Sequence, residues 1–180
     1  MKTRNVELIN LARIDLLKGK TNTDLDSLSK ILRDNYSNKL SYNIDDTSFE
    51  DSLCPPNQFV DDIISEMTVD FKAATGEDIE ISNYWGHIHE KNMSTTLHNH
   101  YDSYVSAVCY VDVPAGSGSI VFRPRLNQYD NSAYASKFEP ERGLYYMFPS
   151  YLDHFVTRNL SEHLRVSISL NFNKKNESNI

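Results

Sequence analysis

The sequence predicts a mostly β fold with flanking helices, built as a β-barrel or sandwich that the helices brace. Two observations predict it: amphipathic helical patterns precede about residue 79, and many short β-patterned segments separated by turn signals follow. The chain has 180 residues and contains no repeat, low-complexity tract or linker. We therefore expect a single domain over 1–180, with a helical supporting segment over 1–78 and a β core over 79–175.

The supporting segment is expected to hold one short strand and two helices. Apolar residues between 6 and 11 favour the strand. Apolar side chains recur at helical spacing over 25–36, where Asp24 is a candidate N-cap, and over 59–71, where Gly76 is the expected stop. The apolar positions of the two helices are Leu28, Ile31, Leu32, Phe59, Ile63, Ile64, Met67 and Phe71.

The core is expected to contain seven strands, near 79–89, 96–102, 104–113, 119–123, 143–148, 153–158 and 164–173. The last strand alternates strictly, so its side chains divide between two faces. One face carries Arg165, Ser167, Ser169 and Asn171, and the other Val166, Ile168, Leu170 and Phe172. We expect the apolar face to pack against the helices and the polar face to look into the barrel, where a buried Arg165 needs an anionic partner.

Composition and charge exclude several classes of protein. The formal net charge is −7 and the pI about 5.3, which argues against a nucleic-acid surface because phosphate binding needs clustered Lys and Arg. No apolar run approaches the ~20 residues of a membrane span, and the polar N-terminal stretch does not resemble a signal peptide. Cys54 and Cys109 make no disulfide framework. We expect a cytoplasmic protein with a small-molecule or peptide substrate and no membrane partner.

The residues with the strongest chemical signal are His100, Asp102, His154 and Arg165. A His-x-carboxylate pair plus a distant histidine has the composition of the facial triad that binds non-haem Fe(II) and leaves positions open for O₂ and a co-substrate. Arg165, eleven residues after His154, offers a planar fork for a carboxylate. The pattern predicts oxidative metal chemistry with a carboxylate-bearing co-substrate.

Two further histidine pairs occupy neighbouring segments. His87 and His89, and likewise His98 and His100, stand two residues apart and so share a face if each segment is a strand. If 79–89 and 96–102 form a hairpin, His89 faces His98. We expect His87 and His89 to be structural groups or supporting neighbours rather than ligands.

These residues resemble the 2-oxoglutarate/Fe(II)-dependent oxygenases, over about residues 83–173. The resemblance implies a double-stranded β-helix, or jelly roll, for the core. It also implies Fe(II), 2-oxoglutarate and O₂ as cofactor and co-substrates, with iron on His100, Asp102 and His154 and the distal carboxylate of 2-oxoglutarate on Arg165 and Ser167. The implied reaction is most simply hydroxylation, with release of succinate and CO₂. The segments HNHYDSYVSAVCYVDVPAGSGSIVF, GLYYMFPSYLDHFV and RVSISLNF are similar to a small bacterial and phage subgroup.

The sequence leaves alternatives open for the metal ligands and for the function. Members of that subgroup often have HxHPxS where this chain has HNHYDS, so His98 is an alternate ligand in a three-histidine site. We favour Asp102 because a carboxylate helps to neutralise Fe(II) and is the commoner choice. A cupin-type metal enzyme that does not use 2-oxoglutarate, or a non-catalytic jelly-roll binding protein, would share the barrel. The polar loops 37–57 and 126–142 are the expected lids, and the substrate itself is not identified.

Overall fold

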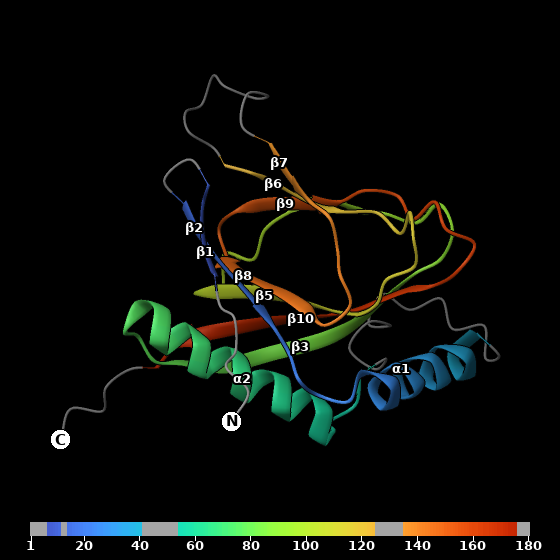
Figure 1. The fold of residues 1–180 in the computed structure, drawn as a ribbon, viewed down its shortest axis with the longest axis horizontal. Coiled ribbons are helices and arrows are strands. Elements are labelled where there is room, and N and C mark those ends of the chain that lie inside the picture. The colour runs from blue at the N-terminus through green and yellow to red at the C-terminus, as the bar shows by residue number, and fades with distance from the viewer. Residues whose placement is uncertain (1–6, 12–13, 41–53, 125–134, 176–180) are drawn as a thin grey trace.

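The computed structural model describes residues 7–11, 14–40, 54–124 and 135–175. Two antiparallel sheets face each other as a double-stranded β-helix, and two helices cover the outer face of the larger sheet (Figure 1). The larger sheet has the order β1-β2-β8-β5-β10-β3 and the smaller sheet β4-β9-β6-β7. The elements are β1 (Glu7–Leu11), β2 (Ile14–Lys20), α1 (Leu25–Leu40), α2 (Gln58–Thr75), β3 (Ile79–His89), β4 (Thr95–His98), β5 (Val105–Asp112), β6 (Ile120–Arg123), β7 (Ser136–Phe138), β8 (Leu144–Pro149), β9 (Asp153–Val156) and β10 (Arg165–Lys174).

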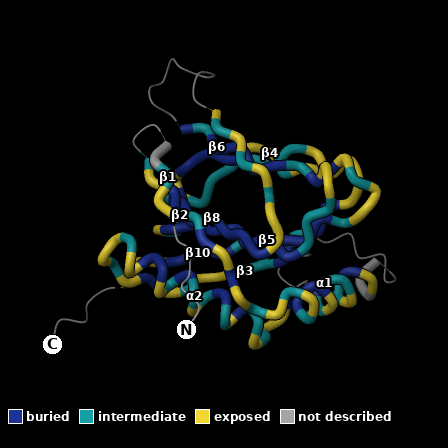
Figure 2. Tube along the Cα trace, in the orientation of Figure 1, coloured by how far each residue is buried: buried dark blue, intermediate teal, exposed yellow. Residues whose placement is uncertain are grey.

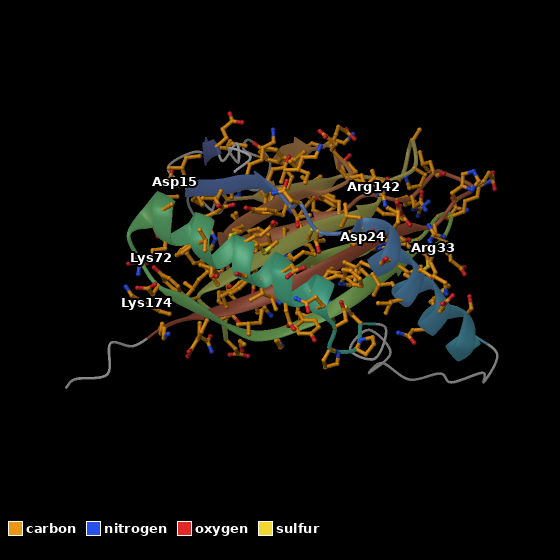
Figure 3. The ribbon with its side chains drawn as sticks, turned by 60° about the horizontal axis from the view of Figure 1, so that its bottom comes forward. Asp15, Asp24, Arg33, Lys72, Arg142 and Lys174 are labelled. Atoms are coloured by element: carbon orange, nitrogen blue, oxygen red, sulfur yellow. The ribbon has the colours of Figure 1, made fainter. Side chains whose placement is uncertain are left out.

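Each helix has one end at the capping residue that the sequence predicts. Asp24 accepts hydrogen bonds from the backbone N–H groups of Asp26 and Ser27, so it caps α1 as predicted. Gly76, with φ 77°, ends α2 in the left-handed conformation. Figure 3 shows Asp24 at the start of α1 and Arg33 farther along it, where Arg33 binds Asp112 at 2.8 Å. This ion pair connects α1 to the end of β5.

The buried side chains form two layers, one on each side of the larger sheet. Between the sheet and the helices, Val166, Ile168, Leu170 and Phe172 of β10 are fully buried, which confirms the predicted apolar face. Cys109 packs in the same layer. The second layer lies between the two sheets, where side chains of β5 and β8 meet those of β6. The central strands of the larger sheet are consequently buried along most of their length (Figure 2).

The structure corrects four details of the predicted strands. β3 and β4 do not form a hairpin, because β3 pairs with β10 and β4 pairs with β9 in the opposite sheet. The expected strand 96–102 ends at His98, and the chain then turns. The predicted loop 126–142 contains β7, and β2 was not expected.

Parts of several predictions lie outside the described residues: Val6 of the first strand, 41–53 of the first expected lid and 126–134 of the second. Among the described residues, neither helix is long and apolar enough to cross a membrane.

Candidate metal centre

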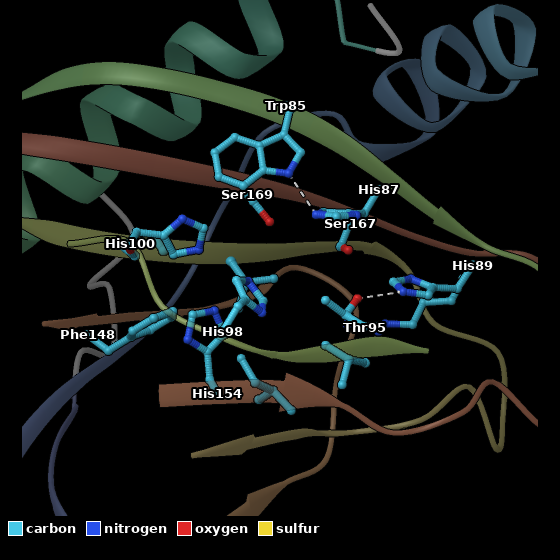
Figure 4. A pocket seen from close by; sticks show the side chains of 16 residues that line it. Trp85, His87, His89, Thr95, His98, His100, Phe148, His154, Ser167 and Ser169 are labelled. Carbon is cyan, nitrogen blue, oxygen red and sulfur yellow. Dashed lines mark hydrogen bonds between the residues drawn. The ribbon is translucent and has the colours of Figure 1, made fainter. Parts of the chain in front are cut away.

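Three histidines converge between the two sheets. His98 ends β4, and its register partner in β9 is His154. His100 follows two residues later in the turn, where its backbone N–H donates to the carbonyl of Ser150 at 2.8 Å. Each of the three offers one ring nitrogen, and these nitrogens lie within 4.8 Å of one another (Figure 4). The spacing suits three ligands of a single metal ion.

Backbone carbonyls determine which ring nitrogen is available in two of these histidines. Nδ1 of His98 lies 2.8 Å from the carbonyl oxygen of Thr96, and Nδ1 of His154 lies 2.9 Å from that of Leu152. A ring nitrogen beside a carbonyl must carry the hydrogen, so Nε2 keeps its lone pair in both rings. Such contacts also fix the ring orientation, as the supporting hydrogen bonds of metal-ligating histidines do.

Burial keeps two members of this cluster uncharged. It lowers the pKa of His154 to about 3 and, with the neighbouring His98 adding to the effect, the pKa of His100 to about 4. Both rings are therefore neutral near pH 7, and a metal can bind without displacing a proton from its ligand nitrogen.

Arg165 is buried in the same pocket with unsatisfied hydrogen-bond donors. Arg165 is the first residue of β10 and is 1% exposed. Its Nε and Nη1 have no hydrogen-bond partner among the described residues. The guanidinium carbon lies 5.3 Å from the ring centroid of Tyr110, whose buried hydroxyl has no hydrogen-bond partner in the described part of the chain. No carboxylate among the described residues pairs with Arg165. A buried cation in this state is costly unless an anionic ligand joins it.

Two rows of polar side chains connect the histidine cluster to Arg165. In the ladder between β10 and β3, Ser169 lies opposite Trp85, Ser167 opposite His87, and Arg165 opposite His89. All six residues line the pocket that the three histidines also line (Figure 4). Trp85 marks the metal end, since its ring centroid is 5.5 Å from that of His100. The pocket thus has a histidine end and an arginine end.

The structure brings together most of the predicted site residues but not Asp102. His100, His154, Arg165 and Ser167 line one pocket, and so does the alternate ligand His98. Asp102 is exposed and lies outside the group of three histidines. The physical reason is the early end of β4: beyond His98 the chain turns, so strand alternation no longer carries Asp102 to the face of His100. The geometry favours the three-histidine ligand set.

Tyr110 is a site residue that sequence reasoning missed. It lies opposite Ser167 in the ladder between β10 and β5. It belongs to an almost continuous apolar strand in which alternation cannot be read, so the sequence carries no signal that singles it out. Only the pairing of β5 with β10 places its hydroxyl near the arginine end of the pocket.

Comparison with known proteins agrees with this geometry. Residues 83–171, just under half of the chain, match the model of a family described as putative 2OG-Fe(II) oxygenase. This segment is therefore similar to the 2OG-Fe(II) oxygenases. The family implies Fe(II), 2-oxoglutarate and O₂. The cluster of three histidines fits a metal, and Arg165, which pairs with no carboxylate among the described residues, fits an anionic co-substrate. Among curated proteins, no significant sequence match is found.

Solved structures of 2OG-Fe(II) oxygenases and related proteins share the fold. A 2OG-Fe(II) oxygenase family oxidoreductase from Burkholderia pseudomallei is 18% identical, with 62% of this chain and 54% of that chain covered and a TM-score of 0.52. A Pseudomonas putida prolyl-4-hydroxylase is 16% identical (84% and 81% covered, TM-score 0.55). AviO1 from Streptomyces viridochromogenes is 9% identical (88% and 89%, TM-score 0.64). This chain therefore spans about half the length of the Burkholderia protein.

Proposed function

We propose that this protein is an Fe(II)- and 2-oxoglutarate-dependent dioxygenase that hydroxylates a small-molecule or peptide substrate and releases succinate and CO₂. One observation carries the proposal: three histidines with converging ring nitrogens share a pocket with a buried arginine that pairs with no carboxylate among the described residues. A cupin-type enzyme that does not use 2-oxoglutarate would leave the buried Arg165 unexplained. A non-catalytic binding protein would leave the three converging ring nitrogens unexplained.

The metal ligands in this proposal are His98, His100 and His154, in place of the Asp102 set that the sequence favoured. Three protein ligands leave coordination positions for a co-substrate and O₂. Bound Fe(II) would supply the activation of O₂ that protein side chains cannot provide. The contribution of His98 and His154 is orientation, because a backbone carbonyl lies at Nδ1 of each ring and leaves Nε2 available to a metal.

The arginine end of the pocket binds the distal carboxylate of 2-oxoglutarate. Arg165 donates from its free Nε and Nη1, and Ser167 and the Tyr110 hydroxyl are the neighbouring donors. The apolar wall includes Phe148, whose ring centroid is 4.8 Å from that of His154. Such a wall excludes water, which strengthens a guanidinium–carboxylate pair.

The experiment is an anaerobic titration of 2-oxoglutarate into the Fe(II)-loaded protein, following the metal-to-ligand charge-transfer absorbance. We expect a saturable band for the wild type. Arg165→Lys keeps the charge but lacks the fork, so it should bind 2-oxoglutarate one to several decades more weakly, given ~1.5–3 kcal/mol for each charge-assisted hydrogen bond. Fe(II) affinity should barely change in this variant. Absence of the band in the wild type would refute the proposal and favour a cupin-type enzyme if Fe(II) still binds.

A further inference from the structure

His89 is the neighbour of Arg165 on the pocket wall. It is the last residue of β3, is 5% exposed, and lies directly opposite Arg165 in the antiparallel ladder with β10. Side chains of directly opposite residues share a face, with Cβ atoms about 4.5–5.5 Å apart. Both residues line the same pocket. The imidazole and the guanidinium therefore lie side by side at the arginine end.

His89 has one ring nitrogen in use and one without a partner. Nε2 lies 2.9 Å from Oγ1 of Thr95 in β4, whereas the buried Nδ1 has no hydrogen-bond partner among the described residues. Arg165 leaves two nitrogens unsatisfied beside it. Buried groups are rarely left in this state. Three free nitrogens at one position of the sheet indicate a ligand that accepts several hydrogen bonds, and a carboxylate has about four acceptor sites.

The charge state of His89 is compatible with donation from Nδ1. Burial, with the nearby Arg165 adding to the effect, lowers its pKa to about 3, so the ring is neutral near pH 7 and carries a single N–H. If that hydrogen is on Nδ1, Nε2 accepts a hydrogen bond from the Thr95 hydroxyl, and both ring nitrogens are satisfied once an acceptor lies at Nδ1.

His89 does not belong to the metal end of the pocket. The group of three converging histidines excludes it, and the β3 residue whose ring lies beside His100 is Trp85, four residues earlier. A strand rises about 3.3 Å per residue, which separates the Cα atoms of Trp85 and His89 by roughly 13 Å. A role in metal binding is therefore not the explanation for its free nitrogen.

We propose that His89 is a co-substrate-binding residue whose Nδ1–H donates to the distal carboxylate held by Arg165. This inference rests on the proposed function, because it takes 2-oxoglutarate as the ligand. With Arg165 and Ser167, His89 would provide a third donor that favours 2-oxo acids carrying a second carboxylate. This role explains why a histidine rather than an apolar residue ends β3 opposite the arginine.

The test compares two amides that each preserve one half of the imidazole. His89→Asn keeps an N–H near the position of Nδ1, whereas His89→Gln reaches the position of Nε2 and keeps the contact with Thr95 but has no donor at Nδ1. Each variant, loaded with Fe(II), is titrated anaerobically with 2-oxoglutarate and with pyruvate, which lacks the distal carboxylate. Thermal melting without ligand monitors the fold.

We expect His89→Gln to bind 2-oxoglutarate about ten- to a hundredfold more weakly than the wild type, with pyruvate affinity unchanged. His89→Asn should recover a large part of the loss even though it lacks the Thr95 contact. Equal 2-oxoglutarate affinity in wild type and His89→Gln, or a parallel loss for pyruvate, would overturn the inference while leaving the proposed function intact. Absence of 2-oxoglutarate binding in the wild type would refute both.

A second measurement needs no variant that could fail to fold. In the Zn(II)-loaded protein with ¹⁵N-labelled histidine, adding 2-oxoglutarate should give His89 the NMR pattern of a ring protonated at Nδ1 and hydrogen-bonded there. A His89 signal that 2-oxoglutarate does not change would contradict the inference, and pyruvate is the control ligand that should not produce the effect.

Discussion

At the scale of single residues, the choice between His98 and Asp102 depends on where one short strand ends. The two positions stand on either side of His100, and each is two residues away from it. A strand that continued through residue 102 would put all three on one face, but β4 ends at His98. His98 remains on the strand opposite His154, whereas Asp102 lies exposed in the turn. In the proposed ligand set, the choice of His98 over Asp102 therefore rests on backbone geometry rather than on residue type.

This difference predicts that only one of two alanine substitutions weakens Fe(II) binding. His98→Ala should weaken Fe(II) binding by more than about a hundredfold, because losing a ligand costs more than the 10–100-fold typical of losing a supporting hydrogen bond. Asp102→Ala, the matched control, should leave the affinity almost unchanged. The measurement is competition with a coloured Fe(II) chelator under anaerobic conditions. The reverse order of effects would restore Asp102 as the ligand.

The sequence alone predicted four residues that line the pocket, and it also predicted that a buried Arg165 needs an anionic partner. The four are His100, His154, Arg165 and Ser167. The two faces of segment 165–171 could be predicted because polar and apolar residues alternate strictly along it. The unsatisfied ring nitrogen of His89 could not be predicted from the sequence. It depends on the pairing of β3 with β10 and on the Thr95 hydroxyl, which comes from the other sheet. The same limit applies to Tyr110.

At the scale of elements, a glycine-containing turn carries the chain from β5 in the larger sheet to β6 in the smaller one. Gly116 and Gly118 both have positive φ, 77° and 85°. A Cβ on Gly116 would meet nothing within 4 Å, whereas a Cβ on Gly118 would lie 2.3 Å from the carbonyl oxygen of Thr157. Gly118 therefore allows the turn to approach the segment that follows β9.

We expect alanine to be tolerated at Gly116 and not at Gly118. Gly116→Ala should lower the free energy of unfolding by about 1–2 kcal/mol, the cost of the left-handed conformation. Gly118→Ala adds a backbone clash and should lower it by several kcal/mol more, about 3–5 in total. Urea unfolding followed by circular dichroism provides the comparison. Equal losses at the two positions would show that the close approach to Thr157 is absent.

Local patterns predicted the helices well and the pairing of strands poorly. Capping by Asp24 and the stop at Gly76 are properties of neighbouring residues, and both are confirmed. The supposed hairpin between 79–89 and 96–102 is wrong, because β3 pairs instead with β10, about eighty residues away along the chain. A jelly roll places consecutive strands in opposite sheets, and periodicity carries no information about that choice.

At the scale of the whole molecule, burying neutral histidines between the sheets makes stability depend on pH. In the folded, metal-free protein the pKa values of His89 and His154 are about 3, below the ordinary value of 6.5 that the unfolded chain is expected to show. Between these values the unfolded state binds more protons. The stability is therefore fully present above pH 6.5 and is lost as the pH falls toward 3.

The expected slope is a loss of up to about 1.4 kcal/mol of unfolding free energy per pH unit for each of these histidines below pH 6.5. Urea unfolding of the metal-free protein at pH 7.5, 6.0 and 5.0 measures it. His89→Gln should flatten the dependence, and His163→Gln, at an exposed position, is the control. Stability that is constant over this range would contradict the burial of neutral histidines.

In the proposed enzyme, three histidines hold a metal at one end of a pocket whose other end holds the distal carboxylate of 2-oxoglutarate. The most direct measurement is an anaerobic crystal structure with Mn(II), a redox-inert substitute for Fe(II), and 2-oxoglutarate. We predict anomalous density for the metal at His98, His100 and His154, with the carboxylate on Arg165. Metal on Asp102 instead of His98, or 2-oxoglutarate bound away from Arg165, would contradict the account.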